Sequence, residues 1–230
     1  MTDVYIVQKL ENNKDIIVNV PGSKSITNRA LMLAALSDGE CNLDGVLFSD
    51  DSRAFLDCLE KLGFQLFIDE NEKRVKVVGT SGEIPNRKAT IDVRSAGTAA
   101  RFLTVMLAVT GGEYTLNSSE QMKKRPMGEI IDLIRNAGVK ISCLEEEGHF
   151  PFKLNSKGIG EIKISIDTSK SSQYASALLM AAVMTGLKIK LTGKRVNGAY
   201  IKITLNMLKQ FGIKYVQFEE NKYNIENNGI

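Results

Sequence analysis

The stretch IVNVPGSKSITNRALMLAALSDG, residues 17–39, decides the fold of this chain. It joins a short apolar strand and a Pro-Gly turn to a long apolar helix, which begins near Lys24 and carries Arg29 in its second turn. The N-terminus of a helix exposes unpaired N–H groups and a partial positive charge, so it attracts anions. Because two cationic side chains stand beside these N–H groups, the stretch predicts an anion-binding site.

The chain repeats this architecture three times. Three similar segments read VNVPGSKS, IDVRSAGT and ISIDTSKSS, and their strands end at Val20, Val93 and Ile166, which are spaced 73 and 73 residues apart. Each strand is followed by an apolar helix, a short strand, an amphipathic helix and a hairpin. This regularity predicts a β-α-β-α-β-β unit in three copies.

The two helices of each unit have different surfaces. The first helix reads ALMLAALS, FLTVMLAVT or ASALLMAAVM and is apolar nearly all round, which indicates burial on every side. The second helix is amphipathic and stops at Gly63, Gly138 or Gly212, as is typical of glycine just beyond a helix C-terminus. We therefore expect an α/β (α+β) fold of inside-out, barrel-like form, in which sheets and outer helices wrap three buried helices.

The spacing also sets the expected domain limits. Residues 15–230 should form one domain with repeats at 15–87, 88–160 and 161–230, and residues 1–14 should form an N-terminal strand. Buried helices that run in equivalent directions bring their N-termini to one end, where the side chains can face a common ligand. The candidates at that end are Lys24, Ser25, Arg29, Ser95, Gly97, Thr98, Arg101, Ser171, Ser172 and Gln173, with Arg125 at the start of the second copy's outer helix.

These residue types suit a phosphorylated ligand, because hydroxyl and N–H groups bind phosphate oxygens while lysine and arginine neutralise their charge. Other readings remain open. The hydroxyl groups of these candidates could serve merely as helix caps, with no role in binding. Arg101 could pair with a structural carboxylate. Asp50 or Asp51, at the start of an outer helix, could orient Lys24.

Composition excludes several classes of protein. The chain has 230 residues, 43% hydrophobic and 25% charged, as expected for a globular protein, and its net charge of +3 is too small to indicate nucleic-acid binding. Cys41, Cys58 and Cys143 are too few and too widely spaced for a disulfide framework or a zinc site, so we expect a reduced, cytoplasmic setting. Neither a signal peptide nor a membrane-spanning apolar run is visible.

Several motifs carry a resemblance to a known family. The sequence is similar to the N-terminal half of the 5-enolpyruvylshikimate-3-phosphate synthases over PGSKSITNRALMLAAL, SAGTAARFL, KKRPMGEIIDLIRNAG, SSQYASALLMAA and AYIKITLNMLKQFG. The resemblance implies two similar domains of three units each, which close over the substrates. It also implies transfer of the enolpyruvyl group of phosphoenolpyruvate to the 5-hydroxyl of shikimate 3-phosphate in the shikimate pathway, with release of phosphate and without metal or cofactor.

The resemblance assigns a role to each matching residue. Lys24 would contact both substrates and take part in proton transfer. The residues implied for shikimate 3-phosphate are Lys24, Ser25, Arg29, Ser171, Ser172, Gln173, Asn197 and Tyr200. Those implied for phosphoenolpyruvate are Lys24, Ser95, Gly97, Thr98, Arg125 and Gln173.

The chain departs from the family pattern in sequence and in length. Arg94 and Ser95 stand where the family usually has Gly-Asn, Asn197 where it often has serine, and Ala199 where it usually has proline. The family enzyme is nearly twice as long, and its other half would supply carboxylates, a histidine and the general base. We therefore expect a monomeric chain that binds shikimate 3-phosphate, is inactive alone, needs that C-terminal domain, and has no nucleic-acid or membrane partner.

There are three alternatives, the first a sister enzyme and the other two from other classes of function. UDP-N-acetylglucosamine enolpyruvyl transferases share the fold and the donor, but they usually place a cysteine acid in the loop that corresponds to residues 111–125, where this chain has none. A non-catalytic domain that binds a phosphorylated ligand could use the same scaffold. An RNA-processing protein of related architecture is disfavoured, because aromatic stacking platforms and a basic stripe are missing.

Overall fold

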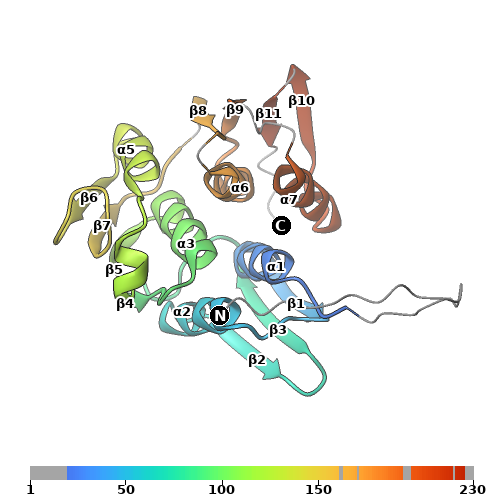
Figure 1. The fold of residues 1–230 in the computed structure, drawn as a ribbon. Coiled ribbons are helices and arrows are strands. Elements are labelled where there is room, and N and C mark those ends of the chain that lie inside the picture. Colours follow the sequence, from blue (N-terminus) through green and yellow to red (C-terminus); the bar gives the residue numbers. More distant parts are fainter. Residues whose placement is uncertain (1–19, 161–162, 170, 194–197, 220, 226–230) are drawn as a thin grey trace, which may run out of the picture.

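The computed structural model describes residues 20–160, 163–169, 171–193, 198–219 and 221–225 (Figure 1). The expected N-terminal strand at residues 1–14, most of the opening strand of the first copy and Asn197 lie outside these ranges. The first copy contains α1 (Lys24–Leu36), β1 (Asp38–Asp44), α2 (Asp50–Lys61), β2 (Gln65–Asp69) and β3 (Arg74–Thr80).

The other two copies show the whole predicted unit. The second contains β4 (Lys88–Asp92), α3 (Gly97–Thr110), β5 (Gly112–Asn117), α4 (Glu120–Lys123), α5 (Gly128–Asn136), β6 (Lys140–Cys143) and β7 (Phe152–Ser156). The third contains β8 (Lys163–Asp167), α6 (Ser172–Ala181), β9 (Lys188–Thr192), α7 (Ala199–Gln210), β10 (Tyr215–Glu219) and β11 (Lys222–Ile225). A 3₁₀ turn, Ala182–Met184, follows α6. The repeat is confirmed, and the short helix α4 is an addition that the pattern did not predict.

The sheets repeat one strand order. The second and third sheets run β4-β5-β7-β6 and β8-β9-β11-β10, and the first runs β1-β3-β2. Pairs β4–β5 and β8–β9 are parallel, whereas every other pair described is antiparallel. The predicted fold class is confirmed, and within the described ranges the sheets are three separate ones rather than a closed barrel.

The inner helices α1, α3 and α6 lie side by side at the centre of the molecule, each with one sheet on its outer side (Figure 1). All residues of α3 up to Val109 are buried, and so are Leu31–Leu36 of α1 and Tyr174–Ala181 of α6. Many of these residues are alanines, whose small side chains let the helix backbones come close. The all-round apolar pattern therefore predicted the position of these helices correctly.

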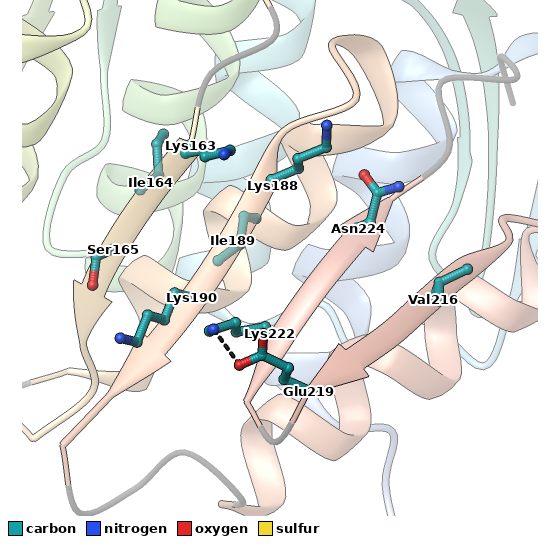
Figure 2. Close-up of a pocket in the computed structure, with 10 residues that line it drawn as sticks. All are labelled: Lys163, Ile164, Ser165, Lys188, Ile189, Lys190, Val216, Glu219, Lys222 and Asn224. Atoms are coloured by element: carbon teal, nitrogen blue, oxygen red, sulfur yellow. Dashed lines mark hydrogen bonds and ion pairs between the residues drawn. The ribbon is translucent and has the colours of Figure 1, made fainter.

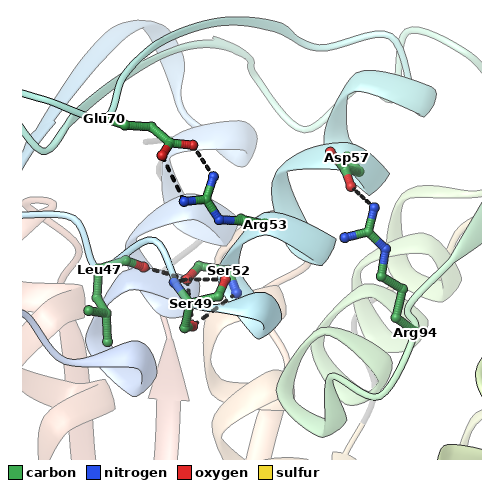
Figure 3. Close-up of polar contacts among 7 residues, drawn as sticks. All are labelled: Leu47, Ser49, Ser52, Arg53, Asp57, Glu70 and Arg94. Carbon is green, nitrogen blue, oxygen red and sulfur yellow. Dashed lines mark hydrogen bonds and ion pairs between the residues drawn. The ribbon is translucent and has the colours of Figure 1, made fainter.

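The amphipathic helices lie outside this core. Helix α2 contacts α1 and α3, while α7 contacts α6 and α1. Helix α2 buries Phe55 and Leu59 and begins with a capping box, in which the Ser49 hydroxyl accepts a hydrogen bond from Ser52 N–H and the Ser52 hydroxyl accepts one from Ser49 N–H (Figure 3). Arg53 of the same helix forms an ion pair with Glu70. No helix in the described part of the chain is long and apolar enough to cross a membrane.

Arg94 occupies a backbone conformation that favours glycine. Its φ is 51°, its N–H donates to Asp92 Oδ1 at 2.8 Å, and its guanidinium pairs with Asp57 of α2 (Figure 3). A left-handed conformation costs a residue with a side chain about 1–2 kcal/mol. The structure thus gives a physical reason for the glycine that the resemblance implies at this position, where this chain instead has an arginine paired with Asp57.

We predict that Arg94→Gly leaves the free energy of unfolding within about 0.5 kcal/mol of the wild type, because relief of strain offsets the greater freedom of glycine in the unfolded chain. Arg94→Val should lower it by about 1–2 kcal/mol, because a β-branched residue fits the left-handed region poorly. Urea unfolding measures both variants, and Asp57→Asn isolates the ion pair. Equal losses for Gly and Val would refute the assignment of strain to Arg94.

Candidate functional site

The N-terminal ends of the three inner helices meet at one end of the molecule. Gln173 in the first turn of α6 donates through Nε2 to the hydroxyl of Thr98 in the first turn of α3, at 3.5 Å. Arg29 of α1 donates through Nη2 to the hydroxyl of Ser176, one turn further along α6, at 2.9 Å. These contacts join the first or second turns of the three helices, so their N-terminal ends lie together, as the sequence predicted.

Arg29 is the central cation of this end. It is only 1% exposed, and its guanidinium donates to the Thr204 hydroxyl at 2.8 Å, the Ser25 carbonyl at 2.7 Å and the Ser176 hydroxyl. Its guanidinium carbon lies 5.3 Å from the ring centroid of Phe102 and 5.7 Å from that of Tyr200. These contacts join α1, α3, α6 and α7 around one positive charge.

No carboxylate pairs with Arg29 among the residues that the structure describes. Burial lowers the pKa of its guanidinium to about 10, and the Tyr200 phenol acts in the opposite direction. Arg29 therefore remains a cation at neutral pH. A buried charge with neutral partners carries a desolvation cost, which an anion bound beside it would offset.

A second buried cation, Arg101, lies at the corresponding end of α3. It is 5% exposed, and its Nη1 donates to the Gly97 carbonyl at 2.8 Å. Its guanidinium lies 5.3 Å from the ring centroid of Tyr174, and its buried Nε has no hydrogen-bond partner. Burial lowers the pKa of Arg101, Tyr174 raises it, and the positive charge of Arg125 lowers it further. Pairing with a structural carboxylate, one of the open readings, is not found among the described residues.

Arg125 lies directly over Gly97. A Cβ atom on Gly97 would stand 2.3 Å from Arg125 Nη1, so a side chain at this position would require the guanidinium to move away. Arg125 itself is exposed and lies in the turn between α4 and α5, which corrects the prediction that it starts the outer helix. Pro126 explains the difference, because the residue before a proline disfavours helical geometry. The Tyr174 hydroxyl donates to the Pro126 carbonyl at 2.9 Å and holds this turn against α6.

Lys24 is the first residue of α1, and its side chain is 48% exposed. Its Nζ lies 3.2 Å from Oδ2 of Asp51, in the first turn of α2. The hypothesis that Asp50 or Asp51 orients Lys24 is therefore confirmed for Asp51. This contact directs the ammonium group from the α1 N-terminus toward the start of α2.

The remaining candidates differ in their surroundings. Ser171 caps α6 by accepting a hydrogen bond from Gln173 N–H at 3.2 Å, so the capping reading holds for this residue. Ser95 instead shares a hydrogen bond with the hydroxyl of Ser119 at 2.7 Å. The N-cap residues of α1 and α3 are Ser23 and Ala96, and neither makes a side-chain cap hydrogen bond. The first-turn N–H groups of those two helices are therefore not occupied by a side-chain cap.

Two further candidates are Ser172, which follows Ser171, and Tyr200, which lies near Arg29. Ser172 begins α6 and is half-buried. Tyr200, near the start of α7, is half exposed, and its ring lies against the Arg29 guanidinium. The hollow drawn in Figure 2 lies elsewhere, on the third sheet, and is lined by different residues.

Sequence reasoning missed the polar partners of the two arginines. Ser176 and Thr204 are fully buried hydroxyls on helices whose other inward residues are apolar, and Tyr174 is nearly buried. A hydroxyl within an apolar helix face needs a partner, because burying it unpaired is unfavourable. That signal marks these positions as paired, but it does not identify Arg29, which precedes Thr204 by 175 residues.

Fold and site together define the chain as a three-repeat α/β domain with two buried arginines where its inner helices begin. The sequence profile described as EPSP synthase (3-phosphoshikimate 1-carboxyvinyltransferase) matches residues 9–229. The chain belongs to the EPSP synthase family.

Individual relatives agree with this assignment. The chain is 35% identical over 226 residues to a 3-phosphoshikimate 1-carboxyvinyltransferase of Trichormus variabilis, which covers 97% of this chain and 53% of the relative. It is 42% identical over 207 residues to the enzyme of that name from Neisseria meningitidis serogroup B, covering 88% and 47%. The chain thus spans about half the length of the curated relatives it matches.

A solved structure of EPSP synthase from Acinetobacter baumannii matches the fold with a TM-score of 0.79 and 24% sequence identity. The match covers 92% of this chain and 47% of the solved one. A second structure of the Acinetobacter baumannii enzyme gives a TM-score of 0.78 at the same identity. These likenesses establish the fold of the chain.

We predict that Thr204→Val lowers the free energy of unfolding by about 1–3 kcal/mol, because Arg29 Nε loses its acceptor in a buried place while the side-chain shape is kept. The matched control is Thr115→Val on the half-buried face of β5, which should change stability by less than about 0.5 kcal/mol. Urea unfolding compares the two. A Thr204 variant as stable as the wild type would show that Arg29 does not depend on this hydrogen bond.

Proposed function

We propose that this chain supplies the shikimate-3-phosphate-binding half of an enolpyruvyl transferase. The complete enzyme would transfer the enolpyruvyl group of phosphoenolpyruvate to the 5-hydroxyl of shikimate 3-phosphate and release phosphate. The observation that carries the proposal is Arg29, a buried cation with neutral partners at the meeting point of three helix N-termini. Membership of the EPSP synthase family supports the choice of substrates.

Shikimate 3-phosphate would lie against α1, α6 and α7. Lys24, Ser25 and Arg29 face it from α1, and Ser171, Ser172 and Gln173 offer hydroxyl, amide and N–H donors to its phosphate from the start of α6. The half-exposed ring of Tyr200 provides an apolar surface for the carbocycle. Asn197, which the resemblance adds to this set, lies outside the described residues.

Phosphoenolpyruvate would lie beside α3. The exposed Arg125 guanidinium over Gly97 offers a planar fork of donors that matches a carboxylate or phosphate. Thr98 and Gln173, already in contact, border the same place, and Ser95 stands just before α3. The buried charge of Arg101 strengthens the positive potential there.

Lys24 would bridge the substrates and take part in proton transfer, oriented by Asp51. Deprotonation of the 5-hydroxyl requires a general base within hydrogen-bond reach, and we assign that base to the C-terminal half of the enzyme. The chain alone would therefore bind without turnover. We place it in the cytoplasm as a monomer that works with that second domain.

We predict that shikimate 3-phosphate binds this chain in a calorimetric titration, whereas UDP-N-acetylglucosamine does not. Arg29→Lys should weaken binding about tenfold or more, because lysine keeps the charge but loses the fork of donors. The matched control is Arg53→Lys on α2, whose arginine pairs with Glu70 at the surface and should be neutral for binding. Binding of the UDP-sugar alone would overturn the proposed substrate.

Turnover is tested by adding the C-terminal half of a relative to this chain. Release of phosphate from phosphoenolpyruvate in the presence of shikimate 3-phosphate is the expected result. Binding without phosphate release by the combined halves would instead favour the alternative of a non-catalytic phosphorylated-ligand-binding domain.

We predict that Gly97→Ala weakens phosphoenolpyruvate binding about tenfold or more, because the new methyl group must displace Arg125 and lose a charge-assisted contact. Titration in the presence of shikimate 3-phosphate measures this effect, and affinity for shikimate 3-phosphate itself should stay within about twofold. Gly128→Ala is the control, since its Cβ meets nothing closer than 3.8 Å. Equal phosphoenolpyruvate affinity in both variants would remove Arg125 from that subsite.

A further inference from the structure

Tyr174 is the only aromatic residue of α6, and it lies immediately after Gln173 at the start of that helix. Its side chain is almost enclosed, with 4% of the residue exposed. A buried tyrosine needs a partner for its hydroxyl group, and this one donates to the Pro126 carbonyl at 2.9 Å. Tyr174 therefore joins an inner helix of the third copy to the turn between α4 and α5 in the second copy.

That turn carries Arg125, whose guanidinium lies over Gly97. The Arg125 side chain makes no hydrogen bond or ion pair with any residue in the part of the chain that the structure describes. Its long side chain is also exposed, so it could adopt several rotamers. The place of the guanidinium over Gly97 therefore depends on how the backbone of the turn is held.

Hydrogen bonds from different directions hold this backbone. The Arg125 N–H donates to the Met122 carbonyl at 2.9 Å, and the Met127 N–H donates to the Gly148 carbonyl at 2.8 Å. Met122 belongs to α4 itself, and Gly148 lies in the loop between β6 and β7. Among the hydrogen bonds of this turn within the described ranges, the one from Tyr174 alone connects it to an inner helix.

Two positive charges meet at Gly97, because Arg101 Nη1 donates to its carbonyl and the Arg125 guanidinium lies over it. Burial lowers the pKa of Arg101, the Tyr174 phenol raises it, and the charge of Arg125 lowers it further. The two cations thus repel each other, which favours movement of the exposed Arg125 guanidinium away from Gly97. A turn that is tied to α6 limits this movement.

We propose that Tyr174 is a positioning residue for phosphoenolpyruvate. Its hydroxyl group holds the Arg125 turn against α6, so that the guanidinium fork stays over Gly97, where the anion would bind. Tyr174 does not touch the substrate, because its hydroxyl group is used within the protein and its ring is enclosed. The inference rests on the phosphoenolpyruvate subsite proposed above and adds to it a residue that acts through Arg125.

Tyr174→Phe tests the inference, because it removes the hydroxyl group and keeps the ring beside Arg101. Calorimetric titration with phosphoenolpyruvate in the presence of shikimate 3-phosphate should show an affinity about three- to tenfold weaker, as expected for the loss of one hydrogen bond. Affinity for shikimate 3-phosphate should stay within about twofold, because the start of α6 is unchanged. Wild-type affinity for phosphoenolpyruvate in this variant would overturn the inference.

Tyr114→Phe is the matched control. Tyr114 is also buried, and its hydroxyl group donates to the Gly111 carbonyl at 3.0 Å, just beyond the other end of α3. Water can replace the hydroxyl group at the exposed Pro126 but not at the buried Gly111, so urea unfolding should show at least as large a loss of stability in the control. Its phosphoenolpyruvate affinity should be unchanged. An equal loss of affinity in both variants would assign the effect to general destabilisation and refute the positioning role.

Arg125→Lys shows whether the hydroxyl group acts through Arg125. Lysine keeps the charge on a flexible stem that does not depend on the exact place of the turn, so adding Tyr174→Phe should weaken phosphoenolpyruvate binding by less than about twofold further. A loss as large as in the wild-type background would show that Tyr174 acts by another route. If the wild-type chain binds no phosphoenolpyruvate in the presence of shikimate 3-phosphate, the proposed subsite fails and the inference fails with it, whereas binding that Tyr174→Phe leaves unchanged refutes the inference alone.

Discussion

Helices α1, α3 and α6 leave almost no face for water, so each must be enclosed by other elements along most of its length. One sheet covers the outer side of each helix, and the helices cover one another on the inner side. Because the three units have the same topology, the helices run in equivalent directions and begin at one end. The position of the candidate site therefore follows from burial of these helices rather than from any single loop.

The same enclosure leaves two positive charges in the interior. Arg29 and Arg101 are held by hydroxyl groups, carbonyl groups and aromatic rings, without a carboxylate among the described residues. Neutral partners accept hydrogen bonds from both guanidinium groups, although Arg101 Nε has none, and they do not cancel the charge, so the desolvation cost persists in the free chain. A bound anion would offset that cost, which links ligand affinity to the stability of the fold. A single domain that supplies half of a binding site can in this way favour anionic ligands by itself.

Local patterns were sufficient to predict the repeat. Apolar residues on all sides of a helix and glycines just beyond helix ends are readable within one unit, and their spacing exposed the three copies. Helix α4 was missed, although Ser119 before Glu120 is a recognisable N-cap signal. The φ of Arg94 was also missed, although the glycine that the resemblance implies at that position is typical of a left-handed backbone.

Contacts between distant segments set the limit of prediction for the site. The candidates at the starts of α1, α3 and α6 followed from helix position and from the family motifs, and the structure brings these three starts together. The partners of Arg29 on α6 and α7 could not be found that way, because 147 and 175 residues separate them from it. The place of Arg125 over Gly97 likewise depends on how the turn after α4 packs against α6.

In the proposed complex, shikimate 3-phosphate touches the beginnings of α1 and α6, and phosphoenolpyruvate touches the beginning of α3 beside it. A two-dimensional NMR titration of the labelled chain with shikimate 3-phosphate tests it most directly. Backbone amide signals of Ser25 and Gln173 should shift together with a single affinity, and that of Thr98 should shift when phosphoenolpyruvate is added next, while those of β2 and β6 stay in place. Shifts confined to one helix, or centred on the outer faces of the sheets, would contradict it.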